Sequence, residues 1–186
     1  MTWVLIIAGL LLAFVVIAYN SLVSLRVRSD SAWSDIDVQL KSRYDLIPNL
    51  VETVKGYAAH ERTTLEKVVE ARAKAMAAQG PAVKAQAEGI LTEALKSLFA
   101  LAEAYPQLRA VENFTQLQSQ LGQLEEEIQR SRRYYNAVVR DLNTRIRQFP
   151  TNLVAGLFNF VPREFFEVAA AAEREAPRVS FEAGTR

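Results

Sequence analysis

The sequence predicts an all-α protein in which an N-terminal single transmembrane helix is continuous with an antiparallel, up-and-down four-helix bundle. Three observations predict this fold. The N-terminus is an uncharged apolar segment, apolar residues recur at helical spacing through residues 25–149, and most Pro and Gly residues fall between the periodic segments. Half of the 186 residues are hydrophobic and only 7 are Gly and 6 are Pro, which is typical of long helices.

Residues 1–24 form the predicted membrane anchor. No charged side chain precedes Arg26, and residues 3–18 contain no polar residue. A helix needs about 20 apolar residues to span a bilayer, and aromatic residues favour both interfaces. The anchor is assigned to this segment through Trp3, Leu10, Phe14 and Tyr19. The alternative, a cleaved signal peptide, should begin with basic residues and end in a small-residue site, and neither feature is clear here.

Basic residues set the expected orientation. Arg26, Arg28, Lys41 and Arg43 follow the apolar segment and none precedes it. By the positive-inside rule, the N-terminus lies outside and the helical domain in the cytoplasm, with the anchor in the bacterial inner membrane.

The helices of the predicted bundle domain, residues 25–149, are separated by Pro and Gly. We expect the first helix to end in a turn at residues 43–48, where Asp45 caps a second helix that carries Pro48 in its first turn. This second helix should end near Gln79, before Gly80-Pro81, and a third should occupy residues 82–104. A fourth helix ends at Phe149-Pro150 and shows a coiled-coil-like seam, formed by Phe114, Leu121, Ile128, Tyr135, Leu142 and Phe149 at intervals of seven residues.

Short connections require neighbouring helices to alternate in direction, so the end of the fourth helix returns towards the membrane. We therefore identify five candidate contacts to lipid headgroups, each of which contributes about 1 kcal/mol near anionic lipid: Arg26, Arg28, Arg140, Arg145 and Arg147. The alternative is a solvated face whose cations favour the C-terminal end of a helix dipole.

Residues 150–172 form a short helical, aromatic segment expected to pack on the bundle or on the membrane surface. Its aromatic candidates are Phe158, Phe160, Phe165 and Phe166. It either closes the end of the bundle or faces lipid or a subunit. Residues 173–186 form a polar tail that we expect to be disordered.

Amides within a helical seam can fix register or oligomeric state. The candidates are Asn20, Asn49, Asn136 and Asn143, of which Asn136 is the strongest because it lies beside Tyr135 in the seam. Capping or a hydrogen bond at the rim is the alternative role. Ion pairs between helices are expected from Arg43, Glu52, Glu103 and Arg133.

Composition argues against several function classes. The 22 basic and 21 acidic residues nearly balance, so we expect no nucleic-acid partner. With no Cys and a single His, His60, we expect no metal site and no cofactor, and a di-iron bundle site lacks its histidines. Asp35, Asp37 and Asp45 are the only carboxylates considered for hydrolysis, and an enzyme is not expected.

The segments 32–41 and 43–52 read AWSDIDVQLK and RYDLIPNLVE. They are followed by Lys55-Gly56-Tyr57-Ala58, Tyr105-Pro106, Arg132-Arg133 with Tyr135-Asn136, and Phe149-Pro150. In these motifs and their order the chain resembles the LemA family over residues 1–167. The resemblance implies a membrane anchor followed by an antiparallel four-helix domain, and it implies no catalytic residue.

The sequence therefore indicates a scaffold or interaction protein of the bacterial envelope that binds the lipid bilayer. It would act by homo-oligomerising or by docking another membrane protein. The alternatives are a regulator or adaptor of a membrane signalling or proteolytic enzyme, and a carboxylate-dependent envelope hydrolase.

Overall fold

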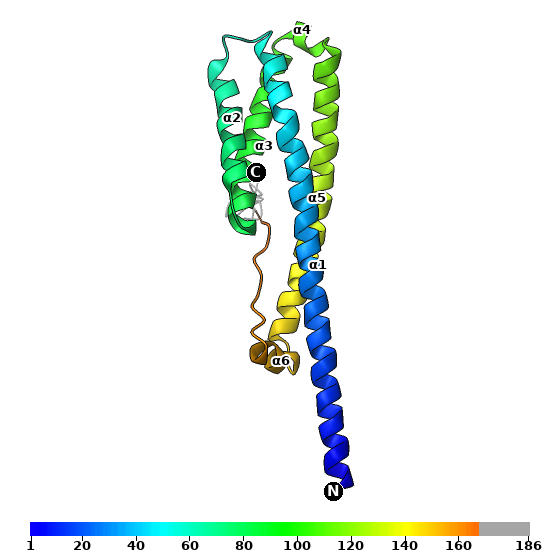
Figure 1. Cartoon of the computed structure of the whole chain (residues 1–186). Coiled ribbons are helices and arrows are strands. Elements are labelled where there is room, and N and C mark those ends of the chain that lie inside the picture. The colour runs from blue at the N-terminus through cyan, green and yellow to red at the C-terminus, as the bar shows by residue number, and fades with distance from the viewer. Residues whose placement is uncertain (168–186) are drawn as a thin grey trace, which may run out of the picture.

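A computed structural model describes residues 1–167, and all of its regular elements are helices (Figure 1). The elements are α1 (Thr2–Lys55), α2 (Arg62–Ala77), α3 (Pro81–Glu103), α4 (Pro106–Arg109), α5 (Glu112–Arg147) and α6 (Thr151–Leu157). The predicted tail at residues 173–186 lies outside the described residues, as does the end of the predicted aromatic segment.

Helix α1 is a single rod of 54 residues. At about 1.5 Å per residue it is roughly 80 Å long. Its first part projects alone from the rest of the molecule (Figure 1). Its second part packs with α2, α3 and α5, and we call this packed part of the chain the body. The apolar N-terminal segment and the body therefore share one uninterrupted helix.

The prediction of a turn at residues 43–48 is wrong, because α1 continues through Pro48 to Lys55. A proline inside a helix cannot donate to the carbonyl four residues earlier, which here belongs to Tyr44. The structure supplies a different donor: the Arg72 Nε of α2 donates to the Tyr44 carbonyl oxygen at 2.8 Å. A side chain from the neighbouring helix thus satisfies the carbonyl that Pro48 leaves free.

The expected second helix is consequently divided. Its first part belongs to α1, and the chain turns at residues 56–61 before α2 begins at Arg62. The break in apolar spacing at Glu61 marks this turn. Asp45, expected as a helix cap, lies instead on the exposed side of α1.

The remaining helices begin and end close to the expected residues. Gly80 adopts a left-handed φ of 78° and Pro81 opens α3, as the Gly-Pro pair predicts. In α5, the seam residues Phe114 to Leu142 are buried, whereas Phe149 lies beyond the end of the helix and is exposed.

The long helices form two pairs of unequal length. Helix α5 lies along α1, and the shorter α2–α3 hairpin lies beside the half of this pair that is distant from the N-terminus (Figure 1). The main core fills the space between them, with Ile36, Leu40 and Ile47 of α1 fully buried. A second, smaller core joins α1, α5 and α6 nearer the projecting end.

After α6 the chain runs back along the body without regular structure (Figure 1). We call residues 162–167 the strap. Phe166 is buried in the main core, and the Glu164 carboxylate lies close to Gly80 in the α2–α3 turn. The segment expected to be short and helical is therefore helical only through α6, and the strap extends the layer that the α2–α3 hairpin begins.

Replacing Arg72 with Met should lower the free energy of unfolding by about 1–3 kcal/mol, because the Tyr44 carbonyl loses its donor. In a Pro48→Ala background the loss should be smaller, since the amide of the new Ala reaches the same carbonyl. Urea unfolding of the full chain in detergent, followed by circular dichroism, measures both costs. Lys74→Met, on the exposed side of α2, is the matched control. Equal costs in the two backgrounds would contradict the pairing of Pro48 with Arg72.

Candidate membrane-proximal site

The projecting part of α1 contains one segment long and apolar enough to cross a membrane. Almost none of it is buried against the rest of the chain. Trp3 and Leu10 are largely exposed, while Phe14 and Tyr19 are about one third exposed. These side chains would be costly in water, so the segment requires an apolar environment that the described chain does not itself supply.

Helix α6 packs against the end of this segment. Ala18 and Leu22 of α1 are buried with Val154 and Ala155 of α6 and Leu142 of α5. Beside this core, the Tyr19 ring lies 4.7 Å from the Phe158 ring and 5.9 Å from the Phe160 ring, centroid to centroid. The aromatic residues thus meet where α1 leaves its exposed segment.

We call residues 149–161, which comprise α6 and its flanks, the foot. One side of the foot packs on α1, and the other is exposed and apolar through Phe149, Leu153, Leu157, Phe158 and Val161. Phe165 and Phe166, by contrast, belong to the strap, where Phe166 is buried and Phe165 packs at the edge of the main core. The predicted aromatic segment therefore divides between a partly exposed foot and a buried strap.

An open cleft of about 440 Å³ lies between α1 and α5 directly beyond the apolar segment. Its lining residues are Ser21, Ser24, Leu25, Arg28, Asp141, Thr144 and Arg145. Two guanidinium groups, three hydroxyl groups and the Asp141 carboxylate line the same space. The two cations outnumber the one carboxylate, so the cleft suits a phosphate better than an apolar ligand. Of the five predicted headgroup contacts, Arg28 and Arg145 share the cleft, while Arg26, Arg140 and Arg147 are exposed but do not line it.

Two asparagines of α5 hold the backbone of the strap. The Asn136 side chain donates to the Phe166 carbonyl oxygen at 3.1 Å and accepts from the Phe166 amide at 2.9 Å. Asn143 makes the same pair of bonds with Arg163, at 2.9 and 2.8 Å. Seven residues of helix and three residues of extended chain both span about 10 Å, so the two amides match the backbone groups that they bind. The other two amide candidates, Asn20 and Asn49, are exposed on α1.

Side chains of the strap bind both helices of the long pair. The Tyr135 hydroxyl donates to the Glu164 carbonyl oxygen at 3.0 Å, and burial raises the pKa of Tyr135. On α1, Arg163 donates to the Ser29 hydroxyl oxygen at 2.7 Å and pairs with Asp30 at 2.6 Å. Phe166 packs against Trp33 of α1 and under the Arg132 guanidinium of α5. The strap thereby joins α1 to α5 along their shared face.

A buried polar network joins three helices at the level of the α2–α3 hairpin. Arg43 of α1 pairs with Glu88 of α3 at 3.3 Å and with Glu125 of α5 at 3.0 Å, and it donates to the Thr92 hydroxyl oxygen at 2.9 Å. The Tyr44 hydroxyl donates to the other Glu88 oxygen. Burial raises the pKa of Glu88, against the opposing effects of Tyr44 and Arg43, and burial with the adjacent Glu88 raises the pKa of Tyr44.

Sequence reasoning missed Glu88 and Glu125 as partners of Arg43. Of the expected ion-pairing residues, only Arg43 pairs between helices in the described chain; Glu52 pairs with Lys55 on α1 itself. The signal for Glu88 was present, because it occupies a position of the apolar stripe that continues through Leu91 and Leu95. A carboxyl group in such a stripe requires a buried partner.

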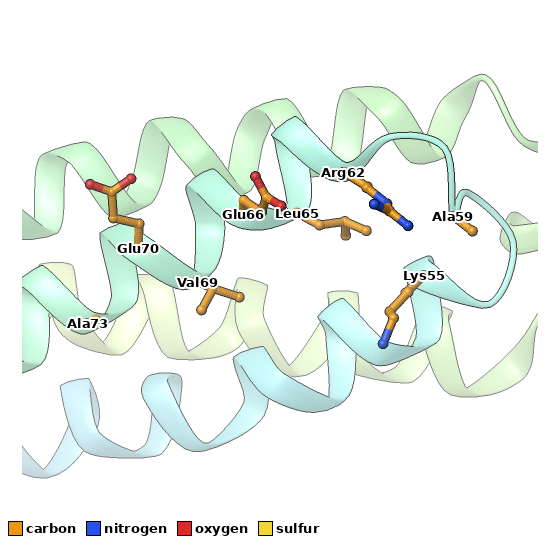
Figure 2. A pocket seen from close by; sticks show the side chains of 8 residues that line it. All are labelled: Lys55, Ala59, Arg62, Leu65, Glu66, Val69, Glu70 and Ala73. Atoms are coloured by element: carbon orange, nitrogen blue, oxygen red, sulfur yellow. The ribbon is translucent and has the colours of Figure 1, made fainter.

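Figure 2 shows a further groove, of about 640 Å³, between the end of α1 and α2. Leu65, Val69 and Ala73 line it, together with Ala59 and the charged residues Lys55, Arg62, Glu66 and Glu70. The charged groups have both signs and spread along the groove, so no set of polar groups converges on one point. His60 is exposed in the adjacent turn.

The carboxylates considered for hydrolysis do not converge either. Asp35 and Asp45 are both exposed on α1, ten residues apart, which is about 15 Å along the helix. Two carboxylates that act on one glycosidic bond lie about 5–9.5 Å apart. Asp35 and Asp37 are two residues apart and so point in different directions from the helix.

Comparison with known proteins gives a consistent result. The family described as "LemA family" matches residues 32–181. Over 188 aligned residues, "Magnetosome protein MamQ 1" and "Magnetosome protein MamQ 2" of Paramagnetospirillum magneticum are each 24% identical to this chain, covering 87% of it and 69% of the relative. "Protein LemA" of Metamycoplasma hominis is 30% identical over 130 residues, which cover 67% of this chain and 58% of the relative.

The raised pKa of Glu88 predicts how stability depends on pH. The fold favours the protonated Glu88 carboxyl. The stabilisation that this preference adds to the free energy of unfolding is therefore complete below the ordinary pKa of 4.5, and it is lost as pH rises through the higher pKa of the folded state. As pH rises above 4.5, the free energy of unfolding should therefore fall further for the native chain than for Glu88→Gln. Each unit of pKa difference corresponds to about 1.4 kcal/mol.

Urea unfolding of both chains across pH 4–8 measures this difference directly. Glutamine keeps an oxygen for the Tyr44 hydroxyl, and Glu93→Gln, exposed on the same helix, is the control. Parallel pH profiles for the native chain and Glu88→Gln would show that burial of Glu88 does not control this dependence.

Proposed function

The chain belongs to the LemA family, and we propose that it is a membrane-anchored helical scaffold of the bacterial cell envelope. The observation that carries the proposal is the continuity of α1, which places an exposed apolar segment and the buried core of the body on one rigid helix. From Leu22 to Lys55 this helix is about 50 Å long. Surfaces of the body are thereby held at a fixed height above the membrane.

In this proposal the N-terminus lies outside the inner membrane and the body lies in the cytoplasm. Arg28, Arg145 and Arg163 are all on the body side of the apolar segment, as the positive-inside rule requires. Over the part where α2 and α3 lie beside α1 and α5, the body functions as an antiparallel four-helix bundle. The polar network around Arg43 holds three of these helices in register.

The scaffold acts by self-association or by docking a membrane partner, and its role is not catalytic. The separation of Asp35 and Asp45 argues against the envelope hydrolase. The groove beside α2 favours the second function class, a regulator or adaptor that binds a protein segment, because Leu65, Val69 and Ala73 follow one another along α2 there, among charged residues of both signs (Figure 2).

Three measurements on the full chain test the scaffold. The chain should stay in membranes washed with carbonate, and protease should cleave the body only in vesicles whose cytoplasmic face is outward. In lipid nanodiscs its mass should correspond to more than one copy, or it should purify with one defined membrane protein. Release by carbonate would overturn the anchor; a monomer with no partner would overturn the scaffold.

The cleft between α1 and α5 gives a prediction for lipid binding. If Arg28 and Arg145 bind a lipid phosphate, each contributes about 1 kcal/mol, which is roughly fivefold in affinity. Arg28→Gln with Arg145→Gln should then retain much less phosphatidylglycerol in native mass spectrometry from detergent. Arg62→Gln with Arg109→Gln, at the far end of the body, is the matched control. Equal retention by both variants would refute a headgroup role for the cleft.

A further inference from the structure

The foot, residues 149–161, has an exposed apolar side that neither the core nor the strap covers. We propose that the foot is a second membrane contact, inserted at the boundary between headgroups and acyl chains beside the end of the α1 span. This inference rests on the proposed anchoring of α1. It adds a site of lipid contact that is distant in sequence from the anchor.

The length of the exposed part of α1 indicates how deep in the bilayer the foot lies. The first residue of α1 that packs against the foot and its core is Val15. If Trp3 marks one interface, the stretch from Trp3 to Val15 spans roughly 20 Å, whereas the hydrocarbon core of a bilayer is about 30 Å thick. The remaining 10 Å, approximately, corresponds to residues 15–22, where Ala18 and Leu22 are buried against α6. The edge of the hydrocarbon therefore falls across the foot.

The chemistry of the foot suits this depth. Its outward residues Phe149, Leu153, Leu157 and Val161 recur every four residues and are 65–75% exposed. Residues 148–162 include no charged side chain, whereas Arg145 and Arg147 precede them and Arg163 follows. An apolar face between basic residues is the pattern of segments that lie about 5–10 Å into the interface.

The contacts of the foot fix its position relative to the span. Val154 and Ala155 are buried against α1, and the rings of Phe158 and Phe160 contact Tyr19. The exposed face therefore cannot move away from the end of the span without breaking this small core. Lipid is the occupant at that height, because the same bilayer must surround the exposed residues of α1 immediately before Val15.

Site-directed spin labelling can test the depth, since the natural chain has no cysteine. Single substitutions Leu153→Cys and Leu157→Cys would carry a nitroxide on the foot of the full chain in phosphatidylcholine and phosphatidylglycerol vesicles. Leu10→Cys is the reference within the span, and Ile90→Cys, an exposed apolar position on α3, is the matched reference in water. All four side chains are exposed, so the labels do not disturb the core.

The labels at positions 153 and 157 should collide with oxygen several-fold more often, relative to a water-soluble nickel chelate, than the label at position 90. Their depth should be shallower than that of position 10. If the labels at positions 153 and 157 are as accessible to nickel as the label at position 90, while position 10 is still in the bilayer, the proposed insertion of the foot is wrong but the proposed anchor stands. Exposure of position 10 to nickel would overturn the anchor. Spin–spin broadening with protection from both reagents would assign the face to a second copy instead of lipid.

Discussion

The structure depends on the continuity of α1 through Pro48. A proline in a helix interior normally kinks or ends the helix, at a cost of about 3 kcal/mol, because one carbonyl loses its donor. Here Arg72 donates to that carbonyl, so the same bond that permits α1 to continue also attaches α2 to it. If α1 ended at residue 47, the core residues Leu50 and Val54 would leave the helix that carries Ile36 and Leu40, and the body would lose its fixed height above the apolar segment.

Polar side chains set the alignment of the helices around this rod. Burial of apolar surface is non-directional, whereas a buried charge must keep its partner, since removing that partner costs about 3–5 kcal/mol. Arg43 contacts Glu88 and Glu125 on two other helices, and so defines one level of the body. Asn136 and Asn143 define a second and a third level, because each forms two bonds with a single residue of the strap. Neither set would tolerate a shift of one helical turn.

These features explain which parts of the structure could be predicted from sequence. The apolar N-terminal helix, the Gly80-Pro81 turn and the buried seam from Phe114 to Leu142 follow from local rules that no distant residue overrides. The prediction of a turn at residues 43–48 was wrong because the helix is continued through Pro48 with the help of Arg72, which is remote in sequence. The course of the strap was also inaccessible, since extended chain held by asparagine side chains has no periodicity. Glu88 could have been found, because a carboxyl group at a core position of a helical stripe is unusual.

The small core and the strap together attach α5 and α6 to α1. A lone spanning helix can tilt by up to about 40° in a bilayer, and a rod fixed only by its span would tilt with it. The core of Ala18, Leu22, Leu142 and Val154 joins the returning end of α5 and α6 to α1 at the end of the apolar segment. From there the strap passes over Ser29 and Asp30 to Trp33, and so links this end to the main core. A tilt of the body relative to α1 would have to break both cores and the strap together, so α1, α5 and the strap move as one unit.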